Sequence, residues 1–190
     1  MNEENTKPLR TAVVAIIGRP SAGKSTFLNT ACQEPVSIVS PIPQTTRNAI
    51  KGIVNTSLGQ LIFIDTPGYH DSDKKLNLRL KSVTESQLSD IDCVLYIIDS
   101  TRATGEEEIH TAELLKNIQA KTVVAINKTD LPTAKAEASR KFVAEHLPEI
   151  PAERIFEMSA QKDIGINEVL KGIYDISPEG QPMYDEELYT

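Results

Sequence analysis

The chain has 190 residues, of which 39% are hydrophobic and 25% are charged, and its formal net charge is −7. This composition suits one globular domain with a sizeable core, and the acidic balance argues against strong nucleic-acid binding by these residues. Cys32 and Cys93 share no metal-ligand spacing and indicate no disulfide framework, which fits a reducing cytoplasm. No apolar run reaches the ~18 residues that a membrane helix needs, so we expect a cytoplasmic protein.

Hydrophobic patterning predicts strands that alternate with helices. Strands are expected at 11–17, 49–54, 61–64, 93–98, 122–126 and 155–158, with a hairpin turn at 55–60. Helices are expected from Lys24, at 76–88, at 104–119 behind a capping box opened by Thr104, from Pro132 to before Pro148, and around Ile166 to Ile173. This order predicts an α/β fold, with a doubly wound, mostly parallel sheet of about six strands, one antiparallel edge strand and helices on both faces.

The ends of the chain differ in composition from its middle. Residues 1–10 are polar and predicted to be flexible, residues 11–176 form the predicted domain, and residues 177–190 are expected to begin a linker. Residues 32–48 contain three prolines and form a long irregular segment, and such segments in compact domains are usually functional. Ligands of doubly wound sheets bind at the carboxyl ends of the strands, and the polar motifs below follow such ends.

A phosphate-binding loop follows the first predicted strand. Residues 18–25, Gly-Arg-Pro-Ser-Ala-Gly-Lys-Ser, match the P-loop pattern G-x-x-x-x-G-K-[ST] between a buried strand and an amphipathic helix. The glycines let backbone N–H groups point at phosphate oxygens, the Lys24 ammonium reaches the β- and γ-phosphates, and the Ser25 hydroxyl binds Mg²⁺. The expected phosphate-binding residues are Gly18, Ser21, Ala22, Gly23, Lys24, Ser25 and Thr26.

Two further segments are predicted to sense the γ-phosphate. Asp65 ends an apolar strand, where an unpaired carboxylate is costly, so we expect it to bind Mg²⁺ through a water molecule, with a turn-capping role as the alternative. Gly68, in the same Asp-Thr-Pro-Gly run, is expected to donate its N–H to the γ-phosphate. In the proline-rich loop a threonine hydroxyl is expected on the same ion, and the residues alone do not distinguish Thr45 from Thr46.

A base-recognition motif, Asn-Lys-Thr-Asp, directly follows the strand at 122–126. The Asp130 carboxylate can accept hydrogen bonds from N1–H and N2–H₂ of guanine, which adenine lacks, so this residue selects GTP over ATP. Lys128 is expected to lie along the base and Asn127 to tie the pocket to the P-loop. Ser159 and Ala160, after the last strand, are expected to present a backbone N–H to guanine O6.

With these motifs in this order, the chain resembles the Era/TrmE-like family of translation-associated P-loop GTPases, and most closely the G domains of its Era branch. The resemblance is carried by Pro-Gln-Thr-Thr-Arg at 43–47, Asp-Thr-Pro-Gly-Tyr-His at 65–70 and Pro-Glu-Gly-Gln-Pro at 178–182. It implies a Ras-like G domain that hydrolyses GTP to GDP and phosphate as a conformational switch in small ribosomal subunit assembly. It also implies that Thr46 is the threonine on the metal. The implied metal ligands are then Ser25, Thr46 and Asp65, and the implied catalytic residues are Lys24, Thr46 and Gly68.

The same resemblance implies partners for a longer protein. Members of the Era branch carry a C-terminal KH domain that binds 16S rRNA of the small ribosomal subunit, and this sequence stops before such a domain. We therefore expect RNA binding from that absent domain and no strong nucleic-acid binding from this acidic stretch. Peripheral association of the parent protein with the inner face of the cell membrane is an alternative to a wholly cytoplasmic location.

Several residues limit these expectations. Ser21 stands where potassium-activated relatives usually have Asn, which argues against K⁺ as a cofactor beside GTP/GDP and Mg²⁺. Tyr69 stands where Ras-type enzymes have glutamine, so we expect slow turnover. A nucleotide-gated binding module with incidental hydrolysis and a GTPase of the TrmE or Der type stay open as alternatives. Arg19 is expected to be solvated, with contact to a partner as the alternative. Glu106 to Glu108 are expected to interact favourably with the helix dipole rather than to bind a metal.

Overall fold

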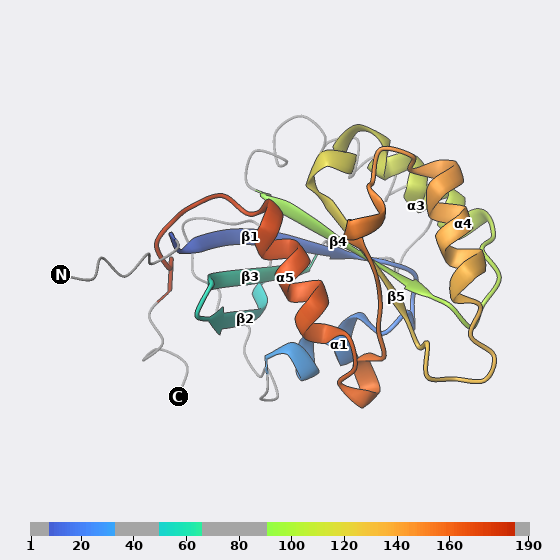
Figure 1. Ribbon diagram of the computed structural model, residues 1–190, viewed down its shortest axis with the longest axis horizontal. Coiled ribbons are helices and arrows are strands. Elements are labelled where there is room, and N and C mark those ends of the chain that lie inside the picture. Colours follow the sequence, from blue (N-terminus) through green and yellow to red (C-terminus); the bar gives the residue numbers. More distant parts are fainter. Residues whose placement is uncertain (1–7, 33–49, 66–90, 185–190) are drawn as a thin grey trace.

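A computed structural model describes residues 8–32, 50–65 and 91–184 of the chain (Figure 1). Its strands are β1 (Arg10–Ile17), β2 (Ile50–Thr56), β3 (Gly59–Asp65), β4 (Cys93–Asp99), β5 (Thr122–Asn127) and β6 (Ile155–Glu157). They form one six-stranded sheet in the order β2-β3-β1-β4-β5-β6. Within these residues β2 pairs antiparallel with β3 and the other neighbouring pairs are parallel, which confirms the predicted α/β sheet.

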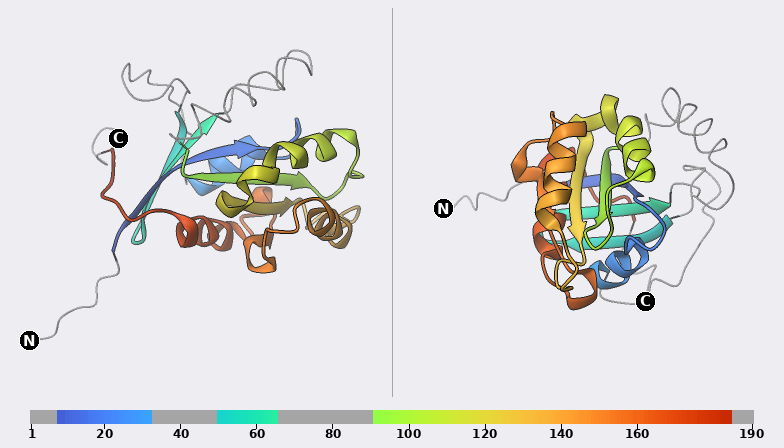
Figure 2. Two further views of the ribbon diagram at one scale, coloured as in Figure 1. Left: turned by 90° about the horizontal axis from the view of Figure 1, so that it is seen from above. Right: turned by 90° about the vertical axis from the view of Figure 1, so that its right-hand side faces the viewer.

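Helices cover both faces of this sheet (Figures 1 and 2). They are α1 (Lys24–Ala31), α3 (Glu106–Leu115), α4 (Ala136–His146) and α5 (Ile166–Ile176), with the short 3₁₀ helices η2 (Lys116–Lys121), η3 (Ala152–Arg154) and η4 (Ala160–Lys162). α1 and α5 pack on one face, and α3 and α4 pack on the other. The predicted helix at 76–88 lies outside the described residues. In the described part of the chain, no helix combines the length and apolar character needed to cross a bilayer.

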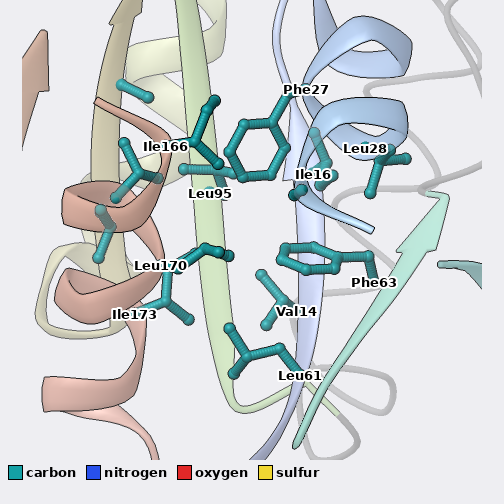
Figure 3. Packing of buried hydrophobic residues seen from close by; sticks show 14 of the residues in the cluster. Val14, Ile16, Phe27, Leu28, Leu61, Phe63, Leu95, Ile166, Leu170 and Ile173 are labelled. Atoms are coloured by element: carbon teal, nitrogen blue, oxygen red, sulfur yellow. The ribbon is translucent and has the colours of Figure 1, made fainter. Parts of the chain in front are cut away.

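The core under α1 and α5 supports the loop between β1 and α1 (Figure 3). Alternation along β1 sends Val14 and Ile16 to this face and Val13 to the opposite one, because successive strand residues point to opposite sides. Phe27 of α1 meets Phe63 of β3 edge to face, with ring centroids 5.8 Å apart and planes at 78°. This contact fixes α1 against the sheet, and it therefore fixes the position of the loop that precedes the helix.

The β2–β3 hairpin is tighter than predicted. Asn55 pairs with Gln60 and Thr56 pairs with Gly59, so the strands continue to the end of the hairpin and residues 57–58 alone form its turn. The polar composition at 55–60 predicted a longer turn, but backbone pairing satisfies these residues, and the Gln60 amide also donates to Oδ1 of Asn55 at 2.9 Å. Side-chain polarity was therefore a poor guide to where the strands end.

Helix α4 begins at Ala136 and not, as predicted, at Pro132. The residues in between form turns, with the N–H of Leu131 donating to the Lys128 carbonyl at 3.2 Å. The N–H of Lys135 then donates to the Ser100 carbonyl at 2.7 Å, which ties this segment to the end of β4. A tertiary contact thus delays the helix beyond the proline that is well suited to start it.

The predicted capping box before α3 is wrong. The helix begins at Glu106 with Gly105 as its N-cap, and no side chain caps it. Thr104 therefore does not play the role that the sequence indicated. Glu107, the acidic partner of the expected box, instead places Oε2 3.5 Å from Nη1 of Arg19.

The segment after α5 returns to the start of β1 (Figure 1). The N–H of Thr11 donates to the Pro178 carbonyl at 3.2 Å, and the N–H of Gly180 donates to the Leu9 carbonyl at 3.0 Å. Further along, the fully buried Gln60 of β3 accepts from the N–H groups of Met183 and Tyr184 at 2.9 and 3.0 Å. Its amide donates to the Tyr184 carbonyl at 2.8 Å. One side chain therefore holds the end of this segment against the sheet.

We expect Gln60→Ala to destabilise the chain by about 2 kcal/mol. The N–H groups of Met183 and Tyr184 and the Tyr184 carbonyl all lose a hydrogen-bond partner in this variant. Amide hydrogen exchange at Met183 and Tyr184 should accelerate in the same variant, and urea unfolding gives the free energy. Gln181→Ala is the matched control, since the Gln181 side chain is exposed and only its carbonyl accepts from Thr11. Unchanged exchange at Met183 and Tyr184 would show that Gln60 does not anchor the segment.

Candidate functional site

The loop between β1 and α1 has the backbone shape of a phosphate cradle. Gly18 has a φ of 149° and Gly23 a φ of 104°, values that residues with side chains rarely adopt. A Cβ on Gly18 would clash with the Ile97 carbonyl oxygen, and a Cβ on Gly23 would clash with Nδ2 of Asn127. Glycine at both positions therefore lets the loop turn closely against β4 and β5.

Lys24 brings a positive charge to this loop. Its Nζ donates to the carbonyls of Gly18 and Arg19 at 2.7 and 2.8 Å, so the ammonium lies beside the loop at the N-terminus of α1. The N-terminus of a helix adds unpaired N–H groups and a favourable field for anions. Ser25 and Thr26 are exposed in the first turn of the same helix, where their hydroxyls are accessible. The donor set suits a phosphate chain with a magnesium ion.

Asn127 joins the loop to the other side of the site. This residue ends β5 and is 2% exposed. Its Nδ2 donates to the Ala22 carbonyl at 2.8 Å, so the predicted link between Asn127 and the P-loop is present. Its Oδ1 accepts from the N–H of Ala160 at 3.0 Å. In this structure the Ala160 N–H, expected to face guanine, is thus used within the protein.

The turn after Asn127 is also held rigidly. Lys128 has a φ of 66°, in the left-handed region. The N–H and hydroxyl of Thr129 both donate to the Met158 carbonyl, at 3.2 and 3.0 Å, which ties the turn to the end of β6. Asp130 follows with an exposed side chain. The backbone is therefore fixed at the turn that carries Asp130, the residue predicted to recognise the base.

These groups surround one cavity of about 460 Å³, a size that suits a small-molecule ligand. It is lined by Ser21, Gly23, Lys24, Ser25, Thr26, Asn127, Lys128, Asp130, Leu131, Ser159 and Gln161. The structure therefore brings together the predicted phosphate side and the predicted base side. Leu131 and Gln161 were not predicted, although each lies within two residues of a motif that was.

The remaining predicted residues are placed in part or not at all. Asp65 pairs with Ile16 across β3 and β1, which puts its backbone at the carboxyl end of the sheet, where β1 leads into the P-loop. Thr46 and Gly68 lie outside the described residues, as do Thr45 and Tyr69. The metal and catalytic roles of these residues therefore stay predictions.

Arg19 is buried, and the prediction that it is solvated is wrong. Its side chain is 6% exposed, and its Nε lies 2.8 Å from Oε1 of the fully buried Glu108 on α3. The Tyr96 hydroxyl of β4 donates to the other oxygen of Glu108. Burial raises the pKa of Glu108, against the opposing effects of the Tyr96 hydrogen bond and the Arg19 charge. A buried ion pair thus connects the P-loop to α3.

The dipole role predicted for the acidic run is incomplete at one position. Glu108 is a buried partner of a guanidinium, whereas its neighbour Glu106 is exposed, so a shared dipole effect does not describe both. A signal was available in the sequence. Glu108 precedes the buried Ala112 and Leu115 by four and seven residues, which places it on the inner face of the helix.

The comparisons with known proteins agree with this site. The family model described as 50S ribosome-binding GTPase matches residues 13–128, more than half of the chain. The chain belongs to this GTPase family. A GTPase Era of Treponema denticola is 58% identical over 182 residues, which cover 96% of this chain and 62% of that protein. The chain thus spans less than two thirds of the length of the curated relatives it matches.

Solved structures support the same membership of the GTPase family. A crystal structure of Era in complex with MgGDPNP and nucleotides 1506–1542 of 16S ribosomal RNA matches with a TM-score of 0.73 and 30% identity, over 94% of this chain and 61% of that one. An Aquifex aeolicus Era variant bound to GDP and AlF₄⁻ matches with a TM-score of 0.73 and 31% identity, over 96% of this chain and 62% of that one. Both relatives hold guanine nucleotides.

Proposed function

We propose that this chain binds GTP with Mg²⁺ and hydrolyses GTP to GDP and phosphate as the timer of a conformational switch. The observation that carries the proposal is the position of Asn127. Its side chain bonds to the P-loop through the Ala22 carbonyl and to the loop after β6 through the Ala160 N–H. The phosphate cradle and the base pocket are therefore parts of one preorganised site, as binding of a nucleoside triphosphate requires.

On the phosphate side, the loop amides and the Lys24 ammonium would hold the β- and γ-phosphates and stabilise charge on them as the terminal bond breaks. Ser25, Asp65 and the predicted ligand Thr46 would hold Mg²⁺, which supplies further neutralising charge. The exposed Ser25 hydroxyl beside Lys24 and the place of Asp65 at the end of β3 fit this role. Gly68 is proposed to register the γ-phosphate through its N–H.

On the base side, Asp130 would accept hydrogen bonds from the two guanine donors, and Lys128 would lie along the ring. Adenine lacks those donors and would leave the carboxylate unpaired, which accounts for a preference for GTP. Ser159 lines the same pocket, as does Gln161, one residue beyond Ala160. Because the Ala160 N–H donates to Asn127, we propose that residues 159–161 contact guanine O6 as a group.

We further propose that the parent protein acts in assembly of the small ribosomal subunit. Support comes from the 58% identity to a GTPase Era and from the match to an Era crystallised with 16S rRNA nucleotides. A C-terminal KH domain of the kind found in the Era branch would contact the RNA. The parent protein would be cytoplasmic, with peripheral membrane association as an alternative. Ser21 argues against activation by K⁺. Co-sedimentation of the full protein with isolated small and large subunits tests this role, and binding to large subunits alone would contradict it.

The activity is tested by multiple-turnover phosphate release from GTP with Mg²⁺ present. We expect slow turnover, on the order of 10⁻⁴ s⁻¹ as for unaided Ras-type enzymes. Lys24→Ala should lower the rate by about a hundredfold or more, because one charged stabilising group is lost from the transition state. Lys171→Ala, an exposed lysine on α5, is the matched control and should keep the parental rate. Equal rates for both variants would show that Lys24 is not part of the catalytic site.

A nucleotide-gated binding module is the second candidate. The observation that favours it is Tyr69 at the position where Ras-type enzymes have glutamine. In that case GTP would bind tightly, but phosphate release would stay at the level of the Lys24→Ala variant, with or without small ribosomal subunits. Turnover above that level by the chain alone would favour the enzyme.

A further inference from the structure

Asp99, which no predicted motif includes, pairs with Lys128 on the predicted base side of the pocket. It ends β4, pairs in register with Asn127 of β5, and is 3% exposed. Its Oδ2 lies 2.7 Å from Nζ of Lys128, and its Oδ1 accepts from the N–H and hydroxyl of Thr101 at 2.9 and 2.6 Å. Contacts within the protein therefore orient both oxygens of the Asp99 carboxylate.

The backbone next to Lys128 is held by the same segment. The N–H and hydroxyl of Ser100 both donate to the Asn127 carbonyl, at 3.1 and 2.7 Å. This carbonyl belongs to the peptide that leads into Lys128, whose φ of 66° is unusual for a lysine. Residues 99–101 therefore support Lys128 twice, through its peptide and through its ammonium.

This support matters because a lysine side chain has many rotamers. Lys128 lines the cavity, and its side chain is only 29% exposed. Without an ion-pair partner for its ammonium, the aliphatic part of the side chain could adopt rotamers that leave the pocket. Burial alone would raise the pKa of Asp99, but hydrogen bonds from Lys128 and Thr101 outweigh burial and lower it. Asp99 is thus a carboxylate at neutral pH and can hold the ammonium as an ion pair.

We propose that Asp99 is a positioning residue for nucleotide binding, which holds the Lys128 side chain flat against the place of the purine ring. The inference rests on the proposed binding of GTP. Asp99, at the end of β4, thus contributes to the affinity for the nucleoside part of the ligand. A residue that only caps its own turn through Thr101 would stabilise the fold without acting through Lys128.

Affinity of the chain for fluorescent GDP tests the proposal, with Asp99→Ala, Asp99→Asn, Lys128→Ala and the double variant Asp99→Ala/Lys128→Ala. We expect Asp99→Ala to weaken binding roughly tenfold, and to have little further effect once Lys128 is gone, because coupled residues are not additive. Asp99→Asn should fall in between, since an amide oxygen still accepts from Lys128. Asp175→Ala, an exposed aspartate on α5, is the control and should bind like the parent.

Two outcomes overturn the proposal. Equal weakening by Asp99→Ala in the presence and absence of the Lys128 side chain would show that Asp99 does not act through Lys128. Parental affinity in Asp99→Ala would show that Asp99 does not contribute to nucleotide binding. The preference for GDP over XDP is a further readout, and it should stay unchanged because Asp130 is intact. Failure of the parent chain to bind GDP at all would instead contradict the proposed function.

Discussion

Asp130→Asn is expected to move the nucleotide preference of the chain from GTP to XTP. The Asp130 carboxylate lines the pocket on a turn held by two hydrogen bonds from Thr129, so its place should survive the substitution. An amide N–H can donate to the C2 carbonyl of xanthine, but it meets the guanine amino group donor to donor. We expect GTP affinity to fall by at least about a thousandfold, since a site built for a hydrogen bond strongly rejects the ligand that cannot make it.

Competition of GTP and XTP against fluorescent GDP or XDP measures this change. Asp175→Asn, the same substitution at an exposed site on α5, should leave both affinities as they are in the parent chain. The thermal unfolding midpoint without nucleotide should agree between the two variants. If Asp130→Asn keeps its GTP affinity, Asp130 does not contact the base and the orientation proposed for the nucleotide is wrong.

Loss of the buried carboxylate at Glu108 should have the largest effect on stability. Glu108→Ala would leave the Arg19 guanidinium, 6% exposed, without the carboxylate that lies 2.8 Å from it, and Tyr96 without the acceptor of its hydroxyl. Oε2 of Glu107, 3.5 Å from Nη1 of Arg19, would remain as a more distant and half-exposed partner. Removing one partner of a buried pair typically costs about 3–5 kcal/mol, and we expect a loss of this size in urea unfolding.

The double variant Arg19→Met/Glu108→Met separates loss of charge pairing from loss of volume. Because an apolar pair of similar volume is often tolerated, we expect it to be more stable than Glu108→Ala. Glu106→Ala, two residues earlier and exposed, should be close to the parent. Equal destabilisation by Glu106→Ala and Glu108→Ala would show that Glu108 contributes no more to stability than an exposed acidic residue at the helix start.

Much of the fold could be predicted because its signals are local. Buried strands such as β4 and β5 are continuous apolar runs, and the glycine-rich loop lies between a strand and a helix, so element order and sheet type followed from neighbouring residues. The boundaries were less predictable. The start of α4 depends on the bond from Lys135 to Ser100, which are 35 positions apart, and no local pattern contains that information.

The same difference holds for the site. Most residues lining the pocket belong to motifs that their spacing reveals, because a phosphate cradle and a base pocket need particular residue types in a fixed local order. Gln161 and Leu131 have no such requirement and were missed. The roles of Thr46 and Gly68 remain predictions from the motifs.

By itself, the sequence determined the α/β class, the order of the motifs along the chain and the residue types that are predicted to contact a guanine nucleotide. Only the tertiary structure decided which charged side chains are buried. Arg19 with Glu108 and Asp99 with Lys128 lie 89 and 29 positions apart, and the fold brings each pair together. The physical reason is that removing a charge from water is costly unless a partner is already in place, and the partner is supplied by another strand or helix.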